Sequence, residues 1–203
     1  MKTTKAIIIL TGISLCILRS LHATSSDLMK GKTKTKHTIE LEKVVNAPPA
    51  EVFKLWTSAE GVRKFFAPDA RIGTRPGEEY TILFFPKEDP EGLVHGTKGA
   101  RILELVPNKK MAFEWVTFAG DKWKGRNAPP YASPEIRNQV PLPTWVEMTF
   151  DEMPGAKTKI VFHHYGFQDG ELWEQSQAWF TRAWSMVLDE LAAMLEKNGH
   201  QVR

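Results

Sequence analysis

The sequence predicts an α+β fold in which a curved, seven-stranded antiparallel sheet grips a long C-terminal helix. Seven short segments between residues 37 and 165 have the alternation or composition of strands, and turn residues separate them. The segment from Glu171 to Lys197 has neither glycine nor proline, which is typical of a long helix. Consecutive hairpins give an antiparallel sheet with one apolar face, and this helix is the only element large enough to cover it.

The expected strands span residues 37–46, 70–73, 78–85, 94–106, 111–118, 144–151 and 157–165. Two short helices are expected after the first strand. Pro49 suits the first turn of one, and Ser58 can cap a second that runs to Phe66 before Pro68 ends it. Residues 37–200 are therefore expected to form a single domain.

The C-terminal helix carries a broad apolar stripe. At 100° per residue one line holds Ser176, Phe180, Ala183, Val187, Leu191 and Met194, with tryptophans and leucines on both flanks. Small Ser176 and Ala183 between large aromatic residues indicate one wall of a cavity, although ordinary core packing explains the stripe equally well. Asp169 is the expected N-cap, and Asn198-Gly199 the expected end of the helix.

The first 23 residues resemble an export signal peptide. Lys2 and Lys5 precede an apolar run over residues 6–18, and Ala23 is a small residue suited to cleavage, so we expect a periplasmic or secreted protein. An uncleaved N-terminal membrane anchor is the alternative. Residues 24–36 are polar and lysine-rich, which predicts a solvated tether.

Charge and cysteine content exclude several classes of protein. The leader holds three of the 27 basic residues and no acidic one, which leaves 24 of each sign in the mature chain. Such a balance gives no support to nucleic-acid binding. The single cysteine, Cys16, lies in the leader, so the mature domain has no disulfide and no thiolate ligand.

Residues 119–143 interrupt the series of hairpins. They contain five prolines together with Trp123 and Tyr131, where a hairpin turn needs only a few residues. Long loops in compact domains are often lids or binding loops, so we expect this insertion to lie over the mouth of the cavity.

Three stretches carry a family resemblance: VVNAPPAEVFKLWTSAEGVRKFF, ARILELVPNKKMAFEW, and TKIVFHHYGF followed by AWSMVLDELAAMLE. Together they resemble the SRPBCC superfamily of START-like helix-grip domains, and within it the branch named for the activator of the heat-shock-protein-90 ATPase. The resemblance implies a mostly apolar pocket between sheet and helix, which in relatives holds lipids, sterols, polyketides or other hydrophobic molecules. Ala183 departs from the glycine that usually precedes the tryptophan, and the leader is unusual for a partner of an intracellular chaperone.

The sequence has no established catalytic motif. His164 shares a strand face with Ile160 and Phe162 and is the histidine expected to point inward, where it could orient a ligand carboxylate or carbonyl, act as an acid or base, or simply be hydrogen-bonded at the rim. Arg101 could meet a ligand anion or form a salt bridge at the rim. No metal or cofactor is expected, because the other histidines show no ligand spacing.

We therefore expect the mature protein to bind a small hydrophobic molecule, with no nucleic acid and no membrane span after leader removal. The alternatives are a cyclase, dehydratase or hydrolase-like enzyme in the same cavity, with His164 as its weak catalytic candidate, and a protein-interaction or co-chaperone-like module. The candidate cavity-lining residues are Phe84, Arg101, Trp115, Tyr131, Phe162, His164, Trp173, Ser176, Trp179, Phe180, Ala183 and Val187.

Overall fold

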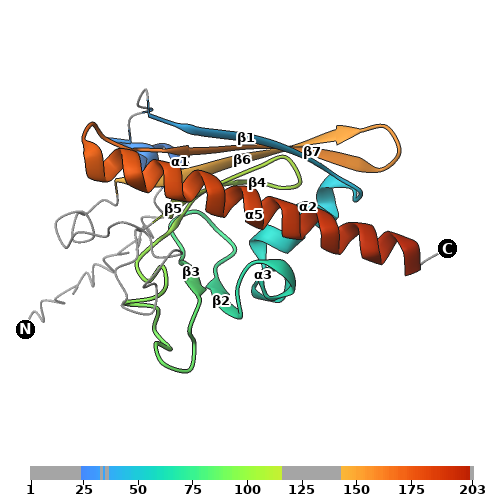
Figure 1. Cartoon of the computed structure of the whole chain (residues 1–203), viewed down its shortest axis with the longest axis horizontal. Helices are drawn as coiled ribbons and strands as arrows, with labels where there is room; N and C mark the ends of the chain where they lie inside the picture. The colour runs from blue at the N-terminus through green and yellow to red at the C-terminus, as the bar shows by residue number, and fades with distance from the viewer. Residues whose placement is uncertain (1–23, 33, 35–36, 116–142, 202–203) are drawn as a thin grey trace, which may run out of the picture.

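A computed structural model describes residues 24–32, 34, 37–115 and 143–201 of the chain. The expected leader, the lid over residues 119–142 and Tyr131 lie outside the described residues. Within them the fold is α+β, and the helix α5 (Glu171–Gln201) lies along one face of an antiparallel sheet (Figure 1). The expected fold class is confirmed.

The main sheet has five strands in the order β1-β7-β6-β5-β4. The strands are β1 (Ile39–Val45), β7 (Lys157–Tyr165), β6 (Thr144–Met153), β5 (Lys110–Trp115) and β4 (Ile102–Val106). A separate two-stranded ladder joins β2 (Asp69–Ile72) and β3 (Tyr80–Leu83). The described residues thus hold seven strands as expected, but in two sheets rather than in one.

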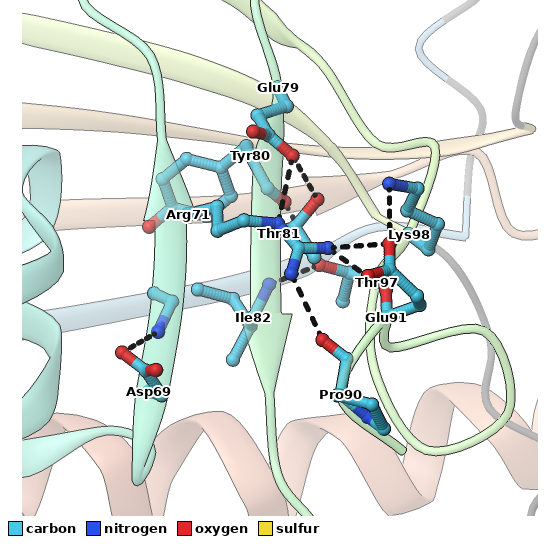
Figure 2. Close-up of polar contacts among 11 residues, drawn as sticks. Asp69, Arg71, Glu79, Tyr80, Thr81, Ile82, Pro90, Glu91, Thr97 and Lys98 are labelled. Atoms are coloured by element: carbon cyan, nitrogen blue, oxygen red, sulfur yellow. Dashed lines mark hydrogen bonds and ion pairs between the residues drawn. The ribbon is translucent and has the colours of Figure 1, made fainter. Parts of the chain in front are cut away.

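The two sheets are separate because the expected strand over residues 94–106 is regular only in β4. Ahead of it, Thr97 mixes backbone and side-chain bonds. Its N–H donates to the Ile82 carbonyl at 3.1 Å, while its hydroxyl accepts from the Ile82 N–H at 2.7 Å and donates to the Tyr80 carbonyl at 2.9 Å (Figure 2). Only isolated bridges, Glu79 with Arg101 and Leu83 with Gly96, continue the ladder from β3 toward β4.

Arg71 fastens the smaller sheet to the loop that follows β3. Its guanidinium donates to the carbonyls of Pro90 at 3.0 Å and Glu91 at 3.1 Å, and it also pairs with the Glu79 carboxylate at 3.4 Å (Figure 2). Lys98 reaches Glu91 from the other side of the loop at 3.2 Å. These bonds satisfy loop carbonyls that no ladder partner reaches.

The helices α2 (Pro49–Thr57) and α3 (Ala59–Phe65) form as expected after β1. Pro49 occupies the first turn of α2, where its missing N–H has no cost. The Ser58 hydroxyl caps α3 by accepting from the Gly61 N–H at 3.1 Å. Both helices pack against the main core through Val52, Trp56 and Val62.

The ends of α5 differ from the expectation. Gly170 lies just before the helix and accepts from the Glu174 N–H at 3.0 Å, while Asp169 instead binds His37 Nε2 at 2.8 Å. At the other end, Asn198-Gly199 does not terminate the helix, which continues to Gln201. Glycine also adopts right-handed helical angles, so it permits a helix end without enforcing one.

The buried line of α5 also differs from the expected one at three of its six positions. It consists of Ser176, Phe180, Trp184, Leu188, Leu191 and Leu195. Ala183 and Val187, expected at the centre, are half-buried on its flank. The larger side chains of Trp184 and Leu188 turn inward in their place, because they bury more apolar surface.

Gly166 makes the sharp connection between β7 and α5. Its φ of 94° lies in the left-handed region, and a Cβ there would collide with the Pro143 carbonyl. Only glycine meets both requirements. This connection brings the inward side chains at the end of β7 under the first turns of α5.

The N-terminal segment is not a solvated tether over the part that is described. Its helix α1 (Ser25–Met29) has a complete capping box between Thr24 and Asp27. Leu28 packs on the face of the sheet opposite α5, in a cluster with Leu103, Ala112, Trp145 and Tyr165. The polar, lysine-rich composition of residues 24–36 gave no sign of this contact, because only Leu28 and the partly buried Met29 supply its apolar surface.

Candidate functional site

The candidate site is the layer between α5 and the sheet face that it covers, called here the inner face. One row of residues crosses all five strands of that face in register. It consists of Ile39, His164, Val146, Phe113 and Ile102. His164 is the single polar member of this row, and its side chain is completely buried. The expectation that His164, and not His163, points inward is confirmed.

Trp184 fixes the state of His164. The indole Nε1–H of Trp184 donates to His164 Nδ1 at 3.1 Å. Burial lowers the pKa of His164 to about 3, so its imidazole is neutral at neutral pH. A neutral imidazole whose Nδ1 accepts a hydrogen bond must carry its proton on Nε2. His164 therefore presents an N–H donor, and not a basic lone pair, at Nε2.

Nε2 of His164 and the hydroxyl of Ser176 are buried polar atoms of this layer without a hydrogen-bond partner among the described residues, as is the indole Nε1 of Trp56 elsewhere in the same core. Ser176 is 1% exposed and precedes Phe180 by one turn on the buried line of α5. The Phe180 ring lies 5.4 Å from the His164 ring. The unpartnered atoms of His164 and Ser176 thus belong to the same layer.

Aromatic rings surround these atoms. Around His164, the Phe167 ring lies at 4.6 Å, and the Phe162 ring lies 4.8 Å from Trp184. Trp115 contacts Trp184 at 4.7 Å. Among the described residues, the buried charged side chains Glu114 and Lys32 lie beside Trp145 on the other face of the sheet. The layer around His164 is therefore mostly apolar, and its buried polar groups are neutral.

Most of the expected lining residues do meet in this layer. Buried members are Trp115, Phe162, His164, Ser176 and Phe180, and partly buried ones that pack against the same core are Phe84, Trp173, Trp179 and Val187. Ala183 is half-buried beside them. Phe66, Phe167 and Trp184 were absent from the expected set, although Phe167 follows the HHYG motif and Trp184 lies on the helix stripe.

Arg101 is the clear exception, because it faces the other side of the sheet. Its guanidinium donates to both carboxylate oxygens of Glu114, at 3.1 and 3.0 Å. The Glu114 side chain is 1% exposed and also meets Lys32 Nζ at 3.4 Å. The alternative interpretation of Arg101 as a salt-bridge residue is the one that the structure supports, and it removes Arg101 from the candidate site.

Among the described residues, no group of three or more histidine, cysteine, aspartate or glutamate side chains could hold a metal ion. No helix in the same ranges is both long and apolar enough to cross a bilayer.

Comparison with known sequences identifies the family. The family described as activator of Hsp90 ATPase homolog 1-like protein matches residues 46–196, which is most of the chain. The chain belongs to this family. No curated protein matches the sequence.

Solved structures confirm the fold at low identity. Protein MLL2253 from Mesorhizobium loti matches with a TM-score of 0.58 at 14% identity, covering 79% of this chain and 97% of its own. The Aha1 dimer from Colwellia psychrerythraea matches with a TM-score of 0.55 at 19% identity, covering 78% and 96%. DynU16, from the dynemicin biosynthetic locus, matches with a TM-score of 0.57 at 14% identity, covering 81% and 49%. The family member described here thus has the helix-grip fold of these proteins.

Proposed function

We propose that this chain binds a small, mostly apolar molecule in the layer between the inner face of the sheet and α5. The observation that carries the proposal is the pair of unpartnered buried atoms, His164 Nε2 and Ser176 Oγ. A buried polar group without a partner costs on the order of 1–3 kcal/mol. Two such groups on facing elements are better explained by a bound molecule than by packing alone, since apolar residues would pack there at no such cost.

The surroundings of the pair set the general character of the molecule. Aromatic and aliphatic side chains make up most of the layer. The buried charged side chains of the described residues, Glu114 and Lys32, lie on the other face of the sheet. Ligand sites of this kind are mostly apolar with a few placed polar groups. The family and the similar structures support the proposal only through the shared fold, since fold alone does not determine function.

No observation specifically favours the enzymatic alternative. Acid–base catalysis at His164 needs a lone pair or an imidazolium proton near neutral pH. The Nδ1 lone pair accepts from Trp184, and burial holds the pKa of His164 at about 3. Arg101, the other polar group expected to act with His164, is bound to Glu114 instead.

We also propose that the protein is exported by its first 23 residues. The basic start, the apolar run and Ala23 support this. Fusing residues 1–23 to an enzyme that is active only outside the cytoplasm tests it. Activity of the fusion is expected, and cytoplasmic retention would contradict the proposal.

Binding is tested first by native mass spectrometry of the full chain purified without detergent. We expect either a co-purified molecule or an adduct after incubation with a panel of fatty acids, sterols and polycyclic aromatic compounds. A chain that carries nothing and takes up no member of the panel would overturn the proposal.

A pair of variants then locates the site. Ser176→Phe adds a ring on the buried line of α5 and should abolish the adduct, whereas Ala178→Phe adds the same ring at an exposed position of the same helix and should leave it. Circular dichroism checks that both variants fold. Retained binding in a folded Ser176→Phe protein would place the ligand elsewhere.

A further inference from the structure

The strongest further feature is the hydrogen-bonding state of the two unpartnered atoms, which restricts the chemistry of the molecule. This step rests on the proposed function above. An indole N–H can only donate, so the bond from Trp184 Nε1 requires Nδ1 of His164 to accept. In the neutral ring the proton then lies on Nε2, which leaves Nε2–H as a buried donor without an acceptor among the described residues.

We propose that the site selects an uncharged ligand that carries a hydrogen-bond acceptor, such as a ketone or ester carbonyl, and that His164 Nε2–H donates to that oxygen. A ligand without an acceptor would leave the donor unpaired in an apolar layer, and this penalty is what gives a polar site its selectivity.

An anionic ligand fits the layer less well than a neutral one. A carboxylate loses its hydration on burial and needs a cation or several donors in exchange. The buried described residues include no arginine, and the buried lysine side chain, Lys32, is paired with Glu114 on the other face of the sheet. The pKa of His164, lowered by burial to about 3, means that the ring itself supplies no positive charge. A neutral carbonyl needs only the single N–H that the site offers.

Ser176 adds a second, adaptable group. Its hydroxyl can donate or accept, and it lies one turn before Phe180, whose ring contacts His164. The serine can therefore satisfy either a second acceptor or a hydroxyl on the same ligand. Trp184 has a positioning role, because it acts on the ligand through the tautomer of His164.

Other polar and apolar features of the molecule give no comparable indication of a ligand or partner. The polar network around Arg71 is satisfied within the protein. The exposed apolar residues Leu93, Val94 and Met186 have nothing near them that indicates what would cover them. The buried Glu114 is already bound by Lys32 and Arg101.

The test uses ligands that differ only in the polar group, measured by calorimetry or fluorescence on the full chain. One series is fluorene, 9-fluorenone and fluorene-9-carboxylate, and the other is tridecane and 2-tridecanone. We expect each ketone to bind about tenfold more tightly than its hydrocarbon, a difference of the size that one unpaired buried donor produces. The carboxylate should bind more weakly than 9-fluorenone.

Two variants check the cause. His164→Phe keeps an aromatic ring but removes the donor, so the ketone and the hydrocarbon should bind equally. Trp184→Phe removes the bond to Nδ1 and should reduce the preference, because the proton can then occupy either nitrogen. In the unvaried chain, ¹⁵N spectra of the histidine ring should show the Nε2–H tautomer, with the Nε2 signal shifting when 9-fluorenone binds.

The outcomes separate this inference from the proposed function. Equal affinity for ketone and hydrocarbon in the unvaried chain overturns the inference and leaves binding of apolar molecules intact. A preference for the carboxylate, or an Nδ1–H tautomer of His164, would also overturn the inference and leave the proposed function intact. Failure of both whole series to bind counts against the proposed function itself.

Discussion

The two faces of the main sheet differ in the polar groups that they bury. On the inner face, the row through Ile39, His164 and Val146 holds one neutral polar side chain with an unpartnered nitrogen. The neighbouring outer row runs through Glu40, His163, Glu147, Ala112 and Glu104. The inner face thus leaves a donor unused, while the outer face is rich in charge.

On the outer face the buried charges are all paired. Glu114, 1% exposed, meets Arg101 at 3.0 Å and Lys32 at 3.4 Å, and Glu147 meets Lys110 at 3.1 Å. Lys32 Nζ also lies 5.5 Å from the centre of the Trp145 ring. A structural polar cluster is expected to be complete in this way. The outer face still holds one buried donor without a partner among the described residues, the Trp145 indole Nε1. The contrast between the faces is therefore one of charge: the outer face pairs its buried charges, whereas the inner face buries the neutral polar groups of His164 and Ser176.

The largest expected effect is on the outer face, at Glu114. Glu114→Gln leaves Lys32, whose side chain is 2% exposed, buried without its anion. Breaking a buried pair costs roughly 3–5 kcal/mol, an upper limit here because the N-terminal segment can leave the sheet. We expect Lys32 to become at least as reactive toward reductive methylation as the exposed Lys30, measured by peptide mass spectrometry.

Glu104→Gln is the matched control. Glu104 also lies on the outer face and pairs with Lys110 at 2.9 Å, but its side chain is 28% exposed. Its loss should cost less than about 1 kcal/mol and leave Lys32 protected. If both variants released Lys32 equally, burial of the Glu114 ion pair would not be what holds the segment.

The next effect is a pH dependence that belongs to the inner face. His164 has a pKa of about 3 in the folded protein, against 6.5 without burial. Between these values the unfolded state binds the additional proton, so stability falls as the pH is lowered through this window, by up to about 1.4 kcal/mol per pH unit. Denaturant unfolding between pH 6.5 and 5 measures it, above the range in which carboxylates titrate.

His164→Phe should remove this part of the slope whatever its effect on absolute stability, because only the slope reports the titration. Retention of the full slope in the variant would assign the proton to another group and would contradict a neutral, buried His164.

Local chemistry made much of the fold predictable. The caps of α3, the strand β7 and the inward direction of His164 depend on neighbours in sequence, and each was predicted correctly. The irregular pairing at Thr97 was not predictable, because its side chain bonds to the backbone of Ile82 and Tyr80, which are 15 and 17 residues away in sequence. The ion pair of Lys32 with Glu114 was missed for a similar reason. A lysine-rich segment is expected to be solvated, and its sequence does not show that a carboxylate far along the chain will bind it.

In the candidate site, too, the features that depend on local sequence were predicted and those that depend on distant contacts were not. Alternation placed Phe162 and His164, and helical periodicity placed Ser176 and Phe180. Neither could assign the tautomer of His164, which depends on a contact with Trp184 on another element. Arg101 was misplaced because the register shift between Ile102 and Glu104 interrupts the alternation of β4.

A smaller effect compares two buried hydroxyls on the inner side. Ser176 Oγ has no partner in the described chain, whereas the Thr158 hydroxyl donates to the Ala47 carbonyl at 2.7 Å. Ser176→Ala should therefore leave stability unchanged or raise it, while Thr158→Val should lower it by roughly 1 kcal/mol. Chemical denaturation of ligand-free protein gives both values. A loss in Ser176→Ala equal to that in Thr158→Val would mean that the serine hydroxyl is already satisfied.

The smallest effect is expected at Lys34, two residues after the buried Lys32. Its side chain is 59% exposed, and its ammonium lies 3.5 Å from Glu147 and 4.5 Å from the centre of the Tyr165 ring. Glu147 keeps Lys110 when Lys34 is lost. Lys34→Gln should therefore cost about 0.2–1 kcal/mol in denaturant unfolding at low salt. The difference should shrink in 1 M salt, where exposed charges are screened within about 3 Å. A cost that persists in high salt would show that this contact, too, acts as a buried pair and holds the N-terminal segment alongside Leu28 and Lys32.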